Sequence, residues 1–370
     1  MPGRFGYSAT PAAFDPQAHM DAINAFWDGK VGATVINLTD LPSSGVPVGY
    51  SIWVQQVAAL YVWNGTSWQT LTGSTGNILL NSAFDIWQRG AGPFTAVGYT
   101  ADQWKLTTAT AVNAALQSTV AGEGCTYSMK ITATAAANAF GLAQTLESIT
   151  VNRYRGKTVT FAVDLQMSAG SQQVSIAVQK SATADSSTAS FSNVANNTVT
   201  VTTARQRFVV TASVPSDSSS AGLRVLISAS NMANGAYITI RQAQLEEGAF
   251  ANPFRTNGGS VQAEQAACFR YYVSMEYGAV PFVSFNSGNA HTGKISFPVQ
   301  MRVPPTLTVA DGNSTPGRIS AISNGGSASS GIAPPIGTFI GTTGWMYTSG
   351  GVAANAPGLL AFTFTASAEL

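Results

Sequence analysis

Charged side chains are scarce in this chain of 370 residues. They make up 9% of the sequence, against roughly 25% in an ordinary soluble domain. The formal net charge is +1 and no cluster of Lys or Arg occurs, so bulk electrostatic attraction to nucleic acid or to an anionic membrane is not supported. Ser, Thr, Ala, Asn and Gly replace much of the missing charge. This composition suits short strands, tight turns and long contacts between subunits, where buried charge would be costly.

Cysteine and histidine are equally rare. The two cysteines, Cys125 and Cys268, are too few for a disulfide framework, and we expect both to be buried in a protein made in a reducing cytosol. Two histidines argue against a His-rich zinc site. The chain start lacks the apolar core of a signal peptide, and no apolar run is long enough to cross a bilayer. An extracellular role would then follow from particle release or lysis, without membrane insertion.

Catalytic motifs are also missing. The sequence contains no Gly-x-Ser-x-Gly elbow, phosphate-binding Gly loop or Cys-x-x-Cys pair. A glycosidase needs two carboxyl groups about 5–9.5 Å apart in one cleft. The 17 Asp and Glu are scattered, and the adjacent pair Glu246 and Glu247 should point to opposite faces of a strand. We therefore expect no enzyme, although a site assembled from distant parts of the chain stays open as an alternative.

Short alternating runs of apolar and polar residues fill the middle of the chain. They are bounded by turn residues and no long helix interrupts them, which predicts an antiparallel β-sandwich of the jelly-roll type. Phe84, Phe161, Val209 and Leu226 are its predicted core residues. The predicted strands lie at 127–131, 158–165, 174–178, 207–210 and 223–227.

Other elements flank this region. A short helix is predicted near residues 15–28, and Asn64-Gly65 predicts a two-residue type I′ turn with Trp63 opposite Thr66 and Tyr61 opposite Trp68. A second helix is predicted from Ser260 to about Met275. The predicted domains are an N-terminal attachment segment (1–36), a small β-hairpin module (37–75), a jelly roll (76–256) and a C-terminal helix with a β-sandwich tip (257–370).

Several stretches resemble one protein family. The stretch 77–90 and the strand 238–248, followed by Asn252-Pro253-Phe254, resemble the first and last strands of the carbohydrate-binding-module-like jelly roll of bacteriophage tail fibre proteins. Three later features are similar to phage fibre tips: 268–272, Met301-Arg302 followed by Pro304-Pro305-Thr306, and 368–370. Modules of this kind often hold a structural Ca²⁺. Asp85 has the place of one acid, but Gln242 and Gln244 stand where other acids are expected, so we expect no metal and no cofactor.

The resemblance implies a phage virion fibre or spike protein that attaches to the bacterial surface by binding a glycan or another receptor without catalysis. Its implied partners are other phage structural proteins, held through the N-terminal segment. A homotrimer is expected because a short helix near 260–275 cannot bury its apolar residues alone. The alternatives are a capsule or polysaccharide depolymerase and a purely structural fibre or head decoration protein.

Sugar binding relies on exposed aromatic faces beside amide and hydroxyl groups. Trp87 and Trp104 flank the early turns of the jelly roll, with Tyr99 between them, while Trp345 and Tyr347 lie in a Gly-rich stretch near the predicted tip. These five are the candidate ligand-binding residues. A core position is the alternative for each, and it is the commoner role for Trp87 and Trp104.

Overall fold

The computed structural model divides into two compact units, Met1–Ser74 and Thr75–Leu370. The helix predicted near residues 15–28 and the tip of the predicted hairpin at Asn64-Gly65 lie outside the described residues. The described residues are 34–35, 37, 39, 41–42, 45–46, 50–55, 59–63, 68–70, and 76–370 apart from 119–124, 286–288, 293, 312, 324–327, 333–336 and 350–356.

The first unit contains a four-stranded sheet. Its strands follow the chain order: β1 (Thr34–Val35), β2 (Ser51–Val54), β3 (Ala59–Trp63) and β4 (Trp68–Thr70). Trp63 pairs with Trp68 and Tyr61 with Thr70, so the predicted pairing of Tyr61 with Trp68 is wrong. The two tryptophans lie directly opposite each other, with ring centroids 5.5 Å apart. Such a cross-strand aromatic pair stabilises the hairpin.

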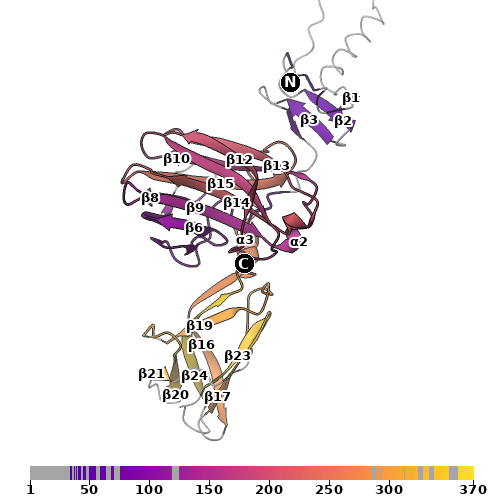
Figure 1. Cartoon of the computed structure of the whole chain (residues 1–370). Helices are drawn as coiled ribbons and strands as arrows, with labels where there is room; N and C mark the ends of the chain where they lie inside the picture. The colour runs from indigo at the N-terminus through magenta and orange to yellow at the C-terminus, as the bar shows by residue number, and fades with distance from the viewer. Residues whose placement is uncertain are drawn as a thin grey trace, which may run out of the picture. The chain divides into compact units, whose positions relative to one another are not determined.

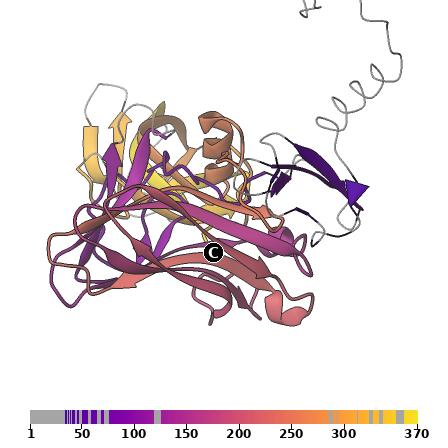
Figure 2. The same ribbon diagram turned by 90° about the horizontal axis from the view of Figure 1, so that it is seen from above.

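The second unit begins with an antiparallel β-sandwich, which confirms the predicted jelly-roll fold (Figure 1, Figure 2). The five-stranded sheet has the order β13-β10-β15-β8-β7 and the six-stranded sheet the order β12-β11-β14-β9-β6-β5. The first comprises β7 (Val112–Ser118), β8 (Tyr127–Ala133), β10 (Thr158–Met167), β13 (Gln206–Ser213) and β15 (Tyr237–Glu247). The second comprises β5 (Gly98–Tyr99), β6 (Lys105–Thr110), β9 (Ala139–Leu146), β11 (Gln172–Ser181), β12 (Ser192–Val201) and β14 (Gly222–Ser230).

One apolar core lies between these sheets. Phe84 and Phe161 are fully buried in it, as predicted. Val209 and Leu226 are not: Val209 is 37% exposed and Leu226 is half-buried, while the residue after each of them is buried. Both predictions fail because consecutive apolar residues occur in these strands, and a strand sends successive side chains to opposite faces. Leu226 consequently lies on the outer face of the six-stranded sheet.

The stretch that opens the jelly roll is not a regular strand, contrary to the prediction. Ile78 donates its N–H to the carbonyl of Leu245 at 2.7 Å, and the Asn77 side chain accepts from the Leu245 N–H at 3.0 Å. Asn81 and Phe84 then take positive φ angles of 47° and 62°. These left-handed residues turn the chain away from β15 before a ladder can form.

Two short α-helices occur in the described part of this unit, α2 (Ser148–Val151) and α3 (Val261–Phe269), with a 3₁₀ turn at Ser218–Ser220. The Ser260 hydroxyl caps α3 by accepting from the N–H of Ala263 at 3.2 Å, as predicted. The helix ends at Phe269, however, and its predicted extension to about Met275 is wrong. Tyr272 begins strand β16 instead, and Cys268 is fully buried within the chain.

The C-terminal region forms a nine-stranded sheet. Its main path is β18-β23-β17-β16-β24-β20-β21, with β19 paired to β24 and β22 paired to β23. A separate core contains Trp345, Phe362 and Phe364. The strands are β16 (Tyr272–Phe285), β17 (Asn289–Thr292), β18 (Ile295–Ser296), β19 (Thr306–Ala310), β20 (Ile319–Ser323), β21 (Ala328–Ile332), β22 (Gly337–Gly341), β23 (Gly344–Ser349) and β24 (Pro357–Ser367).

Candidate functional site

A groove of about 460 Å³ lies on the outer face of the six-stranded sheet. In β14 the side chains of Leu223, Val225 and Ile227 are fully buried in the sandwich core. Because side chains alternate along a strand, Arg224 and Leu226 project from the opposite face, where they line the groove. Jelly-roll alternation thus produces a polar outer surface opposite an apolar inner one.

Three strands and two loops build this groove. Lys105 and Thr107 come from β6 and Gly141 from the neighbouring β9. The β11–β12 connection contributes residues 187–189, and Val97 borders the groove just before β5. A Cβ atom on Gly141 would stand 2.6 Å from Thr107 Oγ1, so a glycine here keeps the groove open.

Two cations face the groove. Lys105 Nζ donates to the hydroxyl of Ser187 at 2.9 Å. Arg224 Nε donates to Gln179 Oε1 at 2.7 Å, and its guanidinium carbon lies 4.0 Å from the ring centroid of Phe191. Burial lowers the pKa of both Lys105 and Arg224, because a partly desolvated cation loses hydration.

The rest of the lining is hydroxyl-rich and contains no carboxylate among the described residues. Hydroxyl groups come from five residues and apolar surface from three, namely Thr107, Thr108, Ser187, Thr188 and Ser228, and Val97, Ala189 and Leu226. Hydroxyl groups both donate and accept hydrogen bonds, and Lys and Arg donate. The groove can therefore hold a hydroxylated or anionic ligand, but it lacks the paired acids of general acid–base catalysis.

A second pocket, of about 320 Å³, lies between the end of β9 and α3. Glu147 and Arg270 both line it, and Arg270 Nη2 lies 3.1 Å from Glu147 Oε1. Glu147 and Arg270 therefore form an ion pair within the chain, and Arg153 adds a further cation to the lining.

Most of the aromatic candidates occupy the cores. Trp104 is fully buried, with its ring centroid 4.8 Å from that of Phe84. Trp345 is 1% exposed between Phe362 and Phe364. Neither ring presents a face to a ligand in this structure.

The other aromatic candidates have different positions. Trp87 is half-buried, stacks on Phe94 and donates through Nε1 to the carbonyl of Phe84 at 2.6 Å. Tyr347 lies in β23, but its side chain is outside the described residues. Tyr99 lies beside the groove, where Lys105 Nζ is 5.4 Å from its ring centroid.

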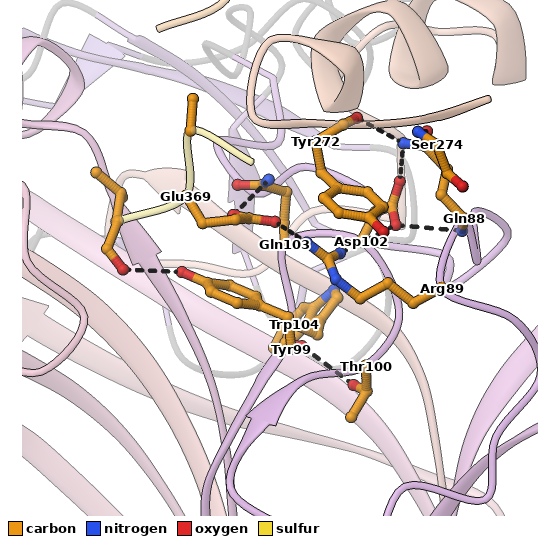
Figure 3. Close-up of polar contacts among 12 residues, drawn as sticks. Gln88, Arg89, Tyr99, Thr100, Asp102, Gln103, Trp104, Tyr272, Ser274 and Glu369 are labelled. Atoms are coloured by element: carbon orange, nitrogen blue, oxygen red, sulfur yellow. Dashed lines mark hydrogen bonds and ion pairs between the residues drawn. The ribbon is translucent and has the colours of Figure 1, made fainter. Parts of the chain in front are cut away.

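Tyr99 also belongs to a buried polar cluster around Arg89 (Figure 3). Arg89 Nη2 lies 2.7 Å from Glu369 Oε1, Nη1 lies 3.4 Å from Asp102 Oδ1, and the guanidinium carbon is 3.6 Å from the ring centroid of Tyr272. The Tyr99 hydroxyl donates to the carbonyl of Leu370 at 3.1 Å. The cluster therefore joins the first turns of the jelly roll to the start of β16 and the residues after β24.

Burial dominates the electrostatics of this cluster. It raises the pKa of the Asp102 carboxyl to about 7 and also raises the pKa of Glu369. The Asp102 side chain has no exposed surface, and that of Glu369 is 8% exposed. Both carboxyl groups are enclosed by hydrogen-bond donors, Gln88 on Asp102 and Gln103 on Glu369. This arrangement fits a structural role, in which the cluster holds the jelly roll and the C-terminal sheet together, rather than a catalytic pair of carboxyl groups open to substrate.

The residues considered above as possible calcium ligands make contacts within the protein. Asp85 Oδ1 accepts from the backbone N–H groups of Thr126 and Tyr127, each at 2.9 Å. Gln244 donates to the buried Glu246 at 2.7 Å. No group of three or more His, Cys, Asp or Glu side chains suited to a metal ion occurs among the described residues. In the same part of the chain, no helix has the length and apolarity needed to span a membrane.

Sequence reasoning missed the groove because it searched for aromatic residues. The available signal was the pair of cations at outward positions of strands: Arg224 alternates with Leu223 and Val225, and Lys105 precedes Leu106. The strand order that places β14, β9 and β6 side by side could not be predicted from the sequence, and without it the two cations could not be assigned to one surface.

Comparison with known proteins found similarity at the level of fold. No protein-family model matches this chain, and no curated protein matches it. Among solved structures, it is similar to the CBM22-2 xylan-binding domain from Paenibacillus barcinonensis, with 14% identity and a TM-score of 0.29 over 40% of this chain and 92% of that one. TmCBM61, solved in complex with β-1,4-galactotriose, shows 13% identity and a TM-score of 0.31 over 47% of this chain and 100% of that one. The enzymatically active domain of tailspike protein 4 from bacteriophage CBA120 shows 12% identity and a TM-score of 0.33 over 46% of this chain and 21% of that one. These similarities concern the fold alone.

Proposed function

We propose that the jelly roll binds a glycan in the groove on its six-stranded sheet. The observation that carries this proposal is the groove's lining, where five hydroxyl-bearing residues and two cations stand beside a few apolar side chains, the largest of them Leu226. A sugar presents the same mixture of hydroxyl groups and apolar C–H surface. Specific sites of this kind combine concave shape with a few convergent polar groups.

Binding without catalysis is part of the proposal. Hydrolysis of a glycosidic bond normally needs two carboxyl groups about 5–9.5 Å apart, and the described lining of the groove has none. The buried acids Asp102 and Glu369 are held by Arg89. A depolymerase is the alternative that the experiment below separates from simple binding.

The wider role that we propose is attachment of a phage virion to the bacterial surface, with the N-terminal segment held by other phage structural proteins. The low charge of the chain and its resemblance to phage fibres support this role. We also propose a homotrimer, for which the helix leaves Val261, 52% exposed, as a contact residue, whereas Cys268 and Tyr271 are buried within their own chain and Tyr272 stacks on Arg89. Light scattering tests the trimer, because a particle of 38.3 kDa at micromolar concentration would contradict it.

The test of glycan binding compares two matched variants. Leu226→Trp fills the groove, whereas Val209→Trp adds the same side chain to an exposed position on the five-stranded sheet. The full chain and both variants are applied to an array of bacterial surface polysaccharides. We expect wild type and Val209→Trp to bind the same glycan and Leu226→Trp to lose about tenfold or more in affinity, about 1.4 kcal/mol.

Two results would overturn the proposal: no binding by wild type, or equal binding by Leu226→Trp. Release of new reducing ends from the bound polysaccharide would identify a depolymerase instead. Binding of the full chain to intact host cells supports attachment, and its absence, with array binding retained, supports a structural fibre.

A further inference from the structure

The two cations of the groove lack carboxylate partners in the described part of the chain. Lys105 contacts the hydroxyl of Ser187, and Arg224 contacts the amide oxygen of Gln179. Both acceptors are neutral, so the direct hydrogen bonds of the two cations go to uncharged groups, although the charge of Glu369 acts on Lys105 from a greater distance.

Several other partly buried arginines in this unit are paired with acids, whereas Arg155 donates to the carbonyl of Ser220. Asp164 lies 2.7 Å from Arg205 and 2.9 Å from Arg207. The same holds for Arg89, which lies 2.7 Å from Glu369. The groove cations thus lack the direct carboxylate contact that Arg89, Arg205 and Arg207 have.

An unneutralised charge away from water is costly, and an anion brought to it restores a favourable interaction. Burial lowers the pKa of Lys105 and the nearby charge of Arg224 adds to this effect, whereas the charge of Glu369 partly opposes it. A bound anion would oppose both effects.

The strand register sets the size of the ligand that both cations can reach. Lys105 pairs with Ala143 of β9, and Ala143 pairs with Leu226 of β14, two residues beyond Arg224. Two strand spacings separate the Lys105 and Arg224 backbones by roughly 10 Å, and the two-residue offset adds roughly 7 Å along the strand. Both side chains are long, so their charged ends can close on a single sugar unit and its substituent.

Building on the proposed glycan site, we propose that the groove recognises an acidic sugar, one that carries a carboxylate. Arg224 donates through Nε to Gln179, which leaves its two Nη groups for a bidentate contact with that carboxylate. Lys105 supplies the second positive charge. The hydroxyl groups of Thr107 and Ser228 contact the sugar hydroxyls, and Leu226 packs against the ring.

The test uses isothermal titration of the full chain with hexuronic-acid and sialic-acid oligosaccharides, each paired with its carboxyl-reduced neutral counterpart. Sulfated oligosaccharides form a third arm, because a sulfate ester could also meet the two cations. We expect an acidic oligosaccharide to bind at least about tenfold more tightly than its neutral counterpart, with an affinity that falls as salt rises.

Lys105→Met and Arg224→Met should each lower that affinity about tenfold and reduce its salt dependence, while Arg224→Lys should retain part of it. Lys130→Met is the matched control, because Lys130 lies over Tyr237 on the other sheet, 4.2 Å from the ring centroid. Thermal unfolding of each variant shows whether a loss of binding reflects a loss of folding.

Equal binding of acidic and neutral oligosaccharides, both abolished by Leu226→Trp, would overturn the acidic preference and keep the glycan site. Binding of sulfated sugars alone would overturn the carboxylate assignment. Array binding unaffected by Leu226→Trp would remove the glycan site itself, and the acidic proposal with it.

Discussion

Replacing Arg89 with Met should destabilise the second unit strongly and in a pH-dependent manner. Arg89 is the cation between two enclosed carboxyl groups, those of Asp102 and Glu369. Removing one partner of a buried ion pair costs about 3–5 kcal/mol, and losing the stacking on Tyr272 adds about 1 kcal/mol. At pH 8 we therefore expect a loss of about 4–6 kcal/mol in the free energy of unfolding.

The loss should shrink at lower pH. The pKa of Asp102 is about 7, so at pH 5 this carboxyl is largely protonated and has no charge for Arg89 to neutralise. We expect the destabilisation at pH 5 to be about half of that at pH 8 or less.

Urea unfolding of the full chain, followed by circular dichroism at both pH values, measures these differences. Lys157→Met is the control: Lys157 lies 2.8 Å from Glu247, but their side chains are 46% and 31% exposed, so we expect a loss below about 1 kcal/mol. If Arg89→Met costs no more than Lys157→Met at pH 8, Arg89 is not the counterion that holds this cluster together.

Three further predictions concern Asp102, Gly141 and Trp345. Because the folded pKa of Asp102 lies above its ordinary value of 3.8, its contribution to stability is full below about pH 4 and is lost as the pH rises through about 7. Asp102→Asn should flatten this part of the stability profile in urea titrations, and an unchanged profile would contradict the assignment. Gly141→Val should press on Thr107, lower the melting temperature, fill the groove and lower glycan affinity about tenfold or more in the protein that stays folded; unchanged affinity would place the ligand elsewhere. Trp345→Ala should cost about 3–5 kcal/mol in unfolding free energy, since its ring is buried in the C-terminal core, whereas a stable variant with lost binding would restore Trp345 as a ligand platform.

The sandwich could be predicted from the sequence because period-two patterning is a local property. All five predicted strand segments lie within observed strands. The face of a residue was less predictable where apolar residues follow one another, as at Val209 and Leu226. The strand register at the hairpin was also mispredicted, because Trp63 pairs with Trp68 and not with Thr66.

The groove could not be predicted, because its parts come from separate strands. Lys105 and Arg224 are 119 positions apart in the numbering, and only the order β6-β9-β14 places them on one surface. Likewise, no local pattern shows that Arg89 meets Glu369 near the other end of the chain. Tyr99, chosen as a possible sugar platform, instead links the groove to that cluster.

The C-terminal sheet begins and ends at one place. Tyr272 at the start of β16 pairs with Ser367 at the end of β24, and the N–H of Ala368 donates to the carbonyl of Tyr271 at 2.7 Å. Beside this pair, Arg89 stacks on the ring of Tyr272 and forms an ion pair with Glu369. A single covalent linker would leave the C-terminal sheet free to rotate relative to the jelly roll. Two paired strands that are both held by Arg89 restrict this rotation, so a twisting force on the C-terminal sheet would be transmitted to the jelly roll.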